Sequence, residues 1–275
     1  MRVEVEVGTR SRPAGAIGLL VPSPIDLPWQ SFEGFEGFED AFEDAKAIAP
    51  EGRGPAAFLI ERPSDGFAFR MSYEGADGDV PTPLFAGLDA GSDSEDGMGA
   101  EWVDEAMREG TLDARTRAAV ARVAAQFDYG PRNADLGADL GASLSSCDLV
   151  TGNCVDINTV LLGCLERLEV PASYVAGYYF AAADEPAHGM HCWVATMTES
   201  GYLEWDVAHA LQAGRPATDP LDEATRGMRA AVSCGRNIAY DVHGRRCTME
   251  HFVQPRWLLA DGSAPMAAVE ARLAA

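Results

Sequence analysis

The stretch from Cys154 to Ala208 constrains the fold most, because a helical pattern in it is followed by strand patterns. The apolar residues of CVDINTVLLGCLERL (154–168) recur at helical spacing: Val160, Leu161, Cys164, Leu165 and Leu168. Three strand-like runs follow the break at Val170-Pro171, the last two joined by a turn at 199–201: SYVAGYYF (173–180), HCWVATM (191–197) and YLEWDVA (202–208). A helix followed by antiparallel strands predicts an α+β fold.

The first 85 residues have the pattern of a small β-rich domain. Val3, Val5 and Val7 alternate with polar residues, as in a half-buried strand. Two further strand-like runs, AAFLIER and GFAFRMSYEG, are separated by Pro63-Ser64-Asp65-Gly66, which predicts a hairpin turn between them.

A phenylalanine-rich segment, residues 32–42, lies within this region. Its phenylalanines recur every three or four residues among glutamates: Phe32, Phe35, Phe38 and Phe42. The segment is open to three interpretations: the edge of an amphipathic helix, a packed loop, or a surface that binds a partner. We favour packing in the core, because aromatic stripes at helical spacing usually face the interior.

Residues 86–100 are small and acidic without an apolar period, which predicts a linker between two domains. An acidic run can also bind calcium, but this one lacks the ligand spacing and closing glutamate of a helix-loop-helix site. LDARTRAAVARVAAQFDYG (112–130) then predicts an amphipathic helix of about four turns. We therefore expect a second domain over 101–255 and a C-terminal tail over 256–275.

The acidic residues outnumber the basic ones by 43 to 21, a formal net charge of −22. A negative field of this size argues against nucleic acid and anionic membranes as partners. No basic start precedes an apolar run at the N-terminus, and the six cysteines form no C-x-x-C pair. We expect a cytoplasmic protein with reduced thiols and no cofactor.

Cys154 is a candidate nucleophile because it lies at the predicted helix N-terminus. The helix dipole and the unpaired N–H groups of a first turn both favour a thiolate. The backbone N–H of the same residue can donate to the oxyanion of a tetrahedral intermediate. Free cysteines are, however, commonly buried packing residues, so the position alone does not assign a role.

His191 and Asp206 are the best-placed partners for this thiol. His191 begins a strand after one helix and one intervening strand, and the predicted turn lies midway between His191 and Asp206. A hairpin folded there brings the two side chains to neighbouring positions on adjacent strands. The carboxylate can then accept from imidazole Nδ1 and fix its tautomer. Each residue has an ordinary alternative: a surface or core histidine, and a strand-end cap.

A metal site built from His188, His191 and Cys192 with Cys154 is a weaker interpretation. Histidines three apart suit one helix face better than a strand end, and no carboxylate completes the set at a recognisable spacing. We therefore expect no metal.

Three blocks of the chain resemble the transglutaminase-like superfamily in its bacterial, papain-like branch. GNCVDINTVLLGCLERLEVPASYVAGYYF is similar to the segment with the family's nucleophile, HCWVAT to its histidine strand, and YLEWDVAHA to its Trp-x-x-Asp-Pro block. A fourth segment, CGRNIAYDVHG (234–244), is similar to the Gly-Arg-Asp-x-x-Asp-Val segment of many bacterial members. The motifs span roughly residues 101–255.

The resemblance implies a papain-like core, in which the helix with the nucleophile packs on an antiparallel sheet. It gives Cys154, His191 and Asp206 the roles of nucleophile, base and orienting acid. The chain departs from the family pattern at Val155, Val207 and Asn237, where a polar or basic residue, proline and aspartate are usual. For the second oxyanion donor the candidates are Trp102 and Gln126.

The expected function is thiol acyl transfer on a peptide or protein substrate. Hydrolysis, as by a cysteine protease or amidase, is favoured, because a single lysine, Lys46, gives no sign of self-crosslinking and small bacterial relatives are commonly described as cysteine proteases. Two alternatives stay open: an amine-accepting transglutaminase, and a catalytically idle scaffold that works through the phenylalanine-rich segment.

Overall fold

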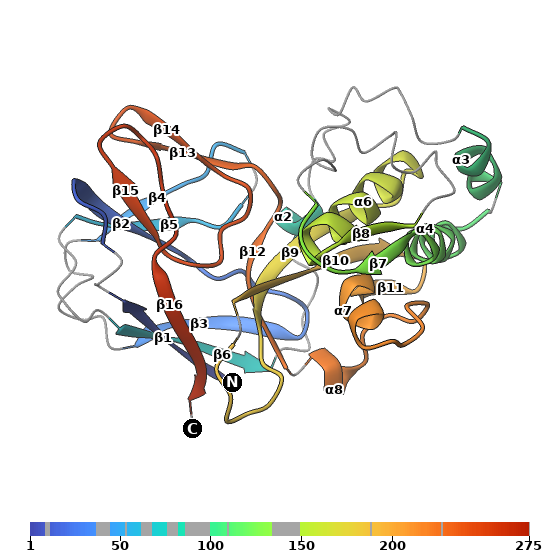
Figure 1. The fold of residues 1–275 in the computed structure, drawn as a ribbon, viewed down its shortest axis with the longest axis horizontal. Coiled ribbons are helices and arrows are strands. Elements are labelled where there is room, and N and C mark those ends of the chain that lie inside the picture. Colours follow the sequence, from blue (N-terminus) through green and yellow to red (C-terminus); the bar gives the residue numbers. More distant parts are fainter. Residues whose placement is uncertain are drawn as a thin grey trace. The chain divides into compact units, whose positions relative to one another are not determined.

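The computed structural model describes residues 1–8, 12–36, 45–52, 54–61, 68–75, 82–85, 100–108, 110–133, 149–187, 189–226 and 228–274. It contains both helices and antiparallel sheets, an α+β fold (Figure 1). By contact the chain divides into two compact units. Unit 1 contains 1–81, 175–191 and 224–275, and unit 2 contains 82–174 and 192–223. The predicted linker 86–100 lies almost wholly outside the described residues.

Unit 1 is built largely from two four-stranded antiparallel sheets. The first has the order β16-β1-β6-β3, with strands Ala268–Ala274, Arg2–Gly8, Ala68–Gly75 and Gln30–Glu36. The second has the order β15-β2-β5-β4, with strands Arg256–Leu259, Ala16–Pro22, Ala57–Ile60 and Lys46–Ile48. Unit 1 also contains a hairpin of β13 and β14, the strand β12, and β9 from Val175 onward. These strands are Ile238–Val242, Arg245–Met249, Arg229–Cys234 and, for β9, Ala172–Tyr179.

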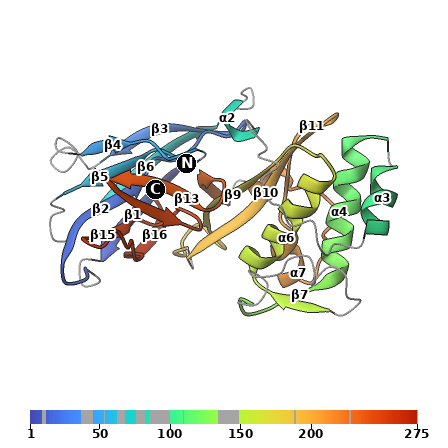
Figure 2. The same cartoon turned by 90° about the horizontal axis from the view of Figure 1, so that it is seen from above.

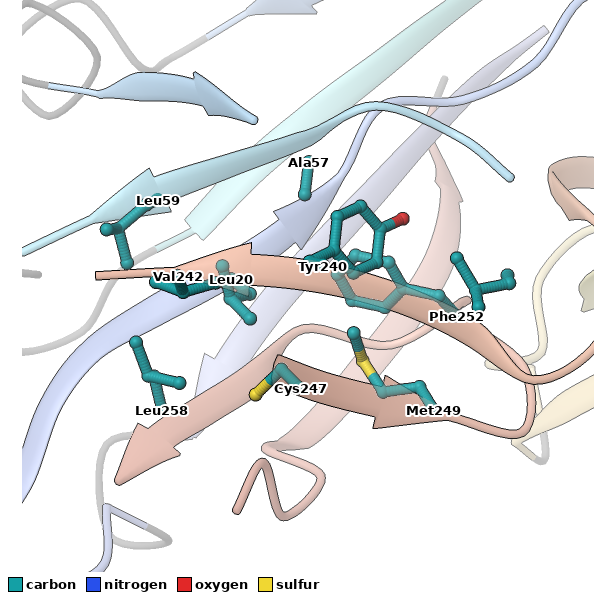
Figure 3. Packing of buried hydrophobic residues seen from close by; sticks show 10 residues of the cluster. Leu20, Ala57, Leu59, Tyr240, Val242, Cys247, Met249, Phe252 and Leu258 are labelled. Atoms are coloured by element: carbon teal, nitrogen blue, oxygen red, sulfur yellow. The ribbon is translucent and has the colours of Figure 1, made fainter. Parts of the chain in front are cut away.

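Alternation explains how the second sheet is covered on both faces. Leu20, Leu59 and Ala57 share one face and lie in a buried cluster with residues of the β13–β14 hairpin, including Tyr240 and Met249 (Figure 3). On the opposite face, Phe58 packs edge-on against Phe35 of the first sheet at 5.7 Å between ring centroids. The second sheet is thus a middle layer between the hairpin and the first sheet.

The predicted strand over 2–7 is confirmed, but the predicted hairpin between the next two strands is wrong. Val3 and Val5 of β1 are fully buried. β5 pairs with β2 and β4, whereas β6 pairs with β1 and β3, so the two strands belong to different sheets. The proposed turn residues, 63–66, lie outside the described residues. The apolar alternation identified the strands but carried no information about their partners.

The phenylalanine-rich segment forms a strand as far as Glu36. A register shift in β3 pairs Phe32 with Tyr73 and Phe35 with Met71, so one residue between them is extra. This bulge places both phenylalanines on the same face although they are three apart. Their rings lie 5.0 Å apart, and packing within unit 1 is confirmed for them. Phe38 and Phe42 lie outside the described residues.

The segment 256–275, expected to be a tail, contributes strands to both sheets. β16 pairs along β1 from Arg2↔Ala274 to Gly8↔Ala268, and β15 pairs with β2. The two ends of the chain therefore lie side by side in one sheet (Figure 1).

Unit 2 contains most of the described helices. They are α2, α3, α4, α6 and α7: Thr82–Phe85, Ala100–Met107, Leu112–Gln126, Cys154–Arg167 and Val207–Gln212. α4 contacts α3, α6 and α7 (Figure 2). The predicted helices at 112 and 154 are confirmed. The short helix α8, Glu223–Arg226, begins where the chain passes back to unit 1.

Unit 2 also contains two strand pairs, although the first two residues of β10, 190–191, belong to unit 1. β7 and β8, Phe127–Tyr129 and Val150–Gly152, pair in parallel. β10 and β11, Met190–Thr198 and Gly201–Trp205, form the predicted antiparallel hairpin, with Thr198 opposite Gly201. Its turn is fixed to α4, because the Glu199 carboxylate accepts the N–H groups of Leu112 and Asp113 at 2.9 and 3.0 Å. None of the helices among the described residues has the length and apolar character needed to cross a membrane.

Candidate active site

Cys154 is the first residue of α6, held there by reciprocal hydrogen bonds. The preceding residue, Asn153, is extended, and its side chain accepts from the N–H groups of Val155 and Asp156 at 2.9 and 3.3 Å. The Asp156 carboxylate in turn accepts from Asn153 N at 3.0 Å. This capping box fixes the start of the helix, so the thiol stays at the positive end of the dipole. Cys154 itself is 8% exposed.

Asp156 also joins the neighbouring loop to the start of the helix. Its Oδ2 accepts from Asn133 N at 2.9 Å, and its Oδ1 lies 4.0 Å from Arg132 Nε. This carboxylate therefore orders both sides of the Cys154 turn.

β7 and β8 approach closely just before Cys154, and glycines permit this. Tyr129 lies opposite Gly152, and Gly130 N donates to Gly152 O at 2.9 Å. A Cβ on Gly152 would lie 2.9 Å from the Cβ of Asp156, and one on Gly130 would lie 2.3 Å from Thr151 Cγ2. β7 is therefore held directly beside the segment that leads into the nucleophile.

Asn158 connects α6 to β10 at the residue that follows His191. It lies one turn after Cys154 and is fully buried. Its Nδ2 donates to Cys192 O at 2.8 Å and lies 3.6 Å from Cys192 Sγ. Burial, and next a hydrogen bond and charge from Cys154, raise the pKa of Cys192 well above its usual value. Cys192 is thus a protonated thiol beside the candidate nucleophile.

Asp206 caps a helix instead of ending a strand. β11 ends at Trp205, and Asp206 is the N-cap of α7, with Oδ1 accepting from His209 N at 3.0 Å. Its side chain is fully buried, and its Oδ2 lies 3.8 Å from His209 Nδ1. The expected strand position of Asp206 is wrong by one residue. Val207 then occupies the first helical position, where proline is favoured, which explains why proline is usual there in the related motif.

His191 lies on β10, immediately before Cys192, and is half-buried. Its ring lies 5.7 Å from that of Tyr179, centroid to centroid. The guanidinium of Arg229, a fully buried residue, lies 5.0 Å from the centroid of the Tyr179 ring. Sequence reasoning missed both residues, because their spacing from His191 follows no motif. The meeting of His191 with Cys154 and Asp206 stays a prediction.

Tyr129 is a further residue that sequence reasoning missed. Burial raises the pKa of its phenol, and the negative charges that Cys154 and Asp206 carry when ionised raise it further. The phenol therefore keeps its proton and lies within electrostatic reach of two members of the predicted triad.

The remaining sequence candidates are unassigned. Trp102 lies on α3, and Gln126 is the last residue of α4, directly before β7. Their role as oxyanion donors stays a prediction. His188, part of the alternative metal cluster, lies outside the described residues.

No family model matches the chain, and no curated protein matches it. Among solved structures, one similar protein is a putative cysteine protease from Cytophaga hutchinsonii, with 13% identity, a TM-score of 0.44, and coverage of 98% of this chain and 96% of that one. The periplasmic domain of TgpA from Pseudomonas aeruginosa has 13% identity and a TM-score of 0.42, covering 77% and 88%. Red sea bream transglutaminase has 10% identity and a TM-score of 0.28, covering 91% of this chain and 57% of its own.

Proposed function

We propose that this chain is a thiol acyl-transfer enzyme with a papain-like, transglutaminase-like core, and that it hydrolyses an amide bond of a peptide or protein. Cys154 is the nucleophile, His191 the base and Asp206 the orienting acid. The observation that carries the proposal is the position of Cys154, a thiol fixed by a capping box as the first residue of α6. The bond from Asn158 to Cys192 supports it, because it connects the nucleophile's helix to the strand of His191.

The reaction would proceed in two steps. The Cys154 thiolate attacks the amide carbon, and the imidazolium of His191 protonates the departing amine as the C–N bond breaks, leaving a thioester. A water molecule then attacks the thioester and gives its proton to His191, and the carboxylic acid leaves as the C–S bond breaks. Asp206 holds the imidazole in the tautomer that these transfers need.

The decisive experiment is a peptide library, with cleaved bonds identified by mass spectrometry. We expect cleavage that Cys154→Ala reduces by about 10⁴-fold or more. Cys234→Ala is the matched control, because Cys234 is as little exposed as Cys154, at 9% against 8%. Cleavage that survives Cys154→Ala, or that Cys234→Ala removes equally, would contradict the assignment. A primary amine added to the reaction distinguishes hydrolysis from transamidation, since an amine-accepting enzyme incorporates it.

Thiol labelling separates an enzyme from an idle scaffold. Burial raises the pKa of Cys164 to about 12, and it also raises the pKa values of Cys192 and Cys247. A raised pKa keeps a thiol protonated at pH 6.5, so these residues should not react with iodoacetamide there. We expect modification of Cys154 first, located by peptide mapping. Absent or indiscriminate labelling would favour the scaffold.

A further inference from the structure

The proposed acyl transfer needs a second donor for the oxyanion. Two donors commonly meet the negative oxygen of a tetrahedral intermediate, and the backbone N–H of Cys154 can supply one. The second donor must reach the same side of Cys154.

The register of β7 places Tyr129 in this neighbourhood. Tyr129 is opposite Gly152, two residues before Cys154, and adjacent strands lie about 4.8 Å apart. Phe127, two residues earlier on the same face of β7, has its Cε1 3.3 Å from where a Cβ on Gly152 would lie. That face of β7 is therefore turned toward the segment that leads into the nucleophile.

Unit 2 also brings Asp206 to this strand. α7, which Asp206 caps, packs on β7. Tyr129 is half-buried, and burial is the main cause of the raised pKa of its phenol. The negative charges of the Cys154 thiolate and the Asp206 carboxylate raise this pKa further. The hydroxyl is therefore a donor throughout the neutral range, close to two groups that hold or develop negative charge.

Resting on the proposed function, we propose that Tyr129 is a catalytic residue whose phenol donates a hydrogen bond to the oxyanion formed when Cys154 attacks the substrate carbonyl. The proton stays on the phenol, so the bond stabilises the intermediate without proton transfer. Loss of one such donor lowers kcat by about 10²–10³-fold.

The test compares a reaction that forms an oxyanion with one that does not. Acylation of Cys154 by a peptide ester or amide passes through a tetrahedral oxyanion, whereas alkylation by iodoacetamide displaces iodide at a saturated carbon. In Tyr129→Phe we expect acylation to fall by about 10²-fold or more, with little change in KM. Alkylation of Cys154 should keep the wild-type rate, which also shows that the thiol site is still folded. Tyr202→Phe is the matched control: it removes a phenol of unit 2 that donates to Glu204 at 2.8 Å.

Three outcomes would contradict the role of Tyr129. Acylation unchanged in Tyr129→Phe overturns the inference while Cys154-dependent activity leaves the proposed function intact. An equal fall in acylation and alkylation also overturns it, because the phenol would then act on the thiolate. Equal turnover by wild type and Cys154→Ala overturns the proposed function and this inference together.

Discussion

At the scale of single residues, Cys154 and Asp206 both lie at the start of a helix. Cys154 is the first residue inside its helix, and Asp206 directly precedes the first residue of another. Cys154 is N1 of α6, and Asp206 is the N-cap of α7. The Asp206 carboxylate has two oxygens: Oδ1 accepts from His209 N, and Oδ2, 3.8 Å from His209 Nδ1, can accept a further hydrogen bond. Its capping role and its proposed orienting role are therefore compatible, and substitution can separate them.

Asp206→Asn and Asp206→Ala form the pair that separates these roles. Asparagine caps helices about as well as aspartate, whereas alanine loses the cap at a cost of about 0.5–2 kcal/mol. We expect the free energy of unfolding, measured with urea, to fall only for alanine. Turnover should fall for both variants, by about 10⁴-fold, because neither side chain carries the negative charge that stabilises the imidazolium. The asparagine amide also favours the wrong tautomer of the imidazole. Full activity in the asparagine variant would show that the carboxylate charge is not used.

At the scale of elements, glycines decide how closely strands and helices can approach. Gly177 lies on β9, where a Cβ would be 2.0 Å from Ala230 O on β12. Gly163 lies within α6, where a Cβ would meet nothing within 4 Å. The two positions therefore give opposite expectations for the same substitution.

Gly177→Ala should destabilise the protein, because backbone must shift to admit the methyl group, at a cost of about 1–3 kcal/mol. Gly163→Ala should stabilise it by up to about 1 kcal/mol, since alanine is the better helix former. Thermal unfolding of both variants measures the difference. An unchanged melting temperature in Gly177→Ala would mean that β9 and β12 can shift apart enough to admit the methyl group at no cost in stability.

The sequence predicted elements better than it predicted their partners. α6 and the β10–β11 hairpin follow from local periodicity and a turn, and both are confirmed. The pairing of β16 with β1 joins opposite ends of the chain, and no local pattern encodes it. The bulge in β3 is a tertiary feature that gave two half-buried phenylalanines, Phe32 and Phe35, a helix-like spacing although they lie on a strand.

The candidate site shows the same division between local and distant information. Helical periodicity was sufficient to place Cys154 at the start of a helix. Tyr129 could not be found in this way, because β7 reaches the nucleophile only through its pairing with β8, across the intervening segment 130–149. The closest signal was FDYG at the end of a strong helix pattern, which had no evident chemistry.

At the scale of the whole molecule, the net charge of −22 affects which substrates arrive fastest. A field of one sign steers oppositely charged molecules toward the protein and slows like-charged ones. Salt shortens the range of this field, from about 10 Å at 0.1 M to about 3 Å at 1 M. With rising salt, kcat/KM should therefore fall for cationic substrates and rise for anionic ones.

The measurement uses two peptides that share the cleaved bond and differ in their flanking residues, arginines in one and glutamates in the other. We expect kcat/KM for the arginine peptide to be the higher at low salt and to fall severalfold between 0.05 and 1 M NaCl, the range over which the Debye length drops from more than 10 Å to about 3 Å. For the glutamate peptide kcat/KM should rise over the same range, while kcat changes little for either, because screening acts on encounter and not on the bound complex. An uncharged peptide with the same bond is the control for effects of salt on the enzyme itself. Parallel salt profiles for all three peptides would mean that the field at the site does not follow the net charge of the chain.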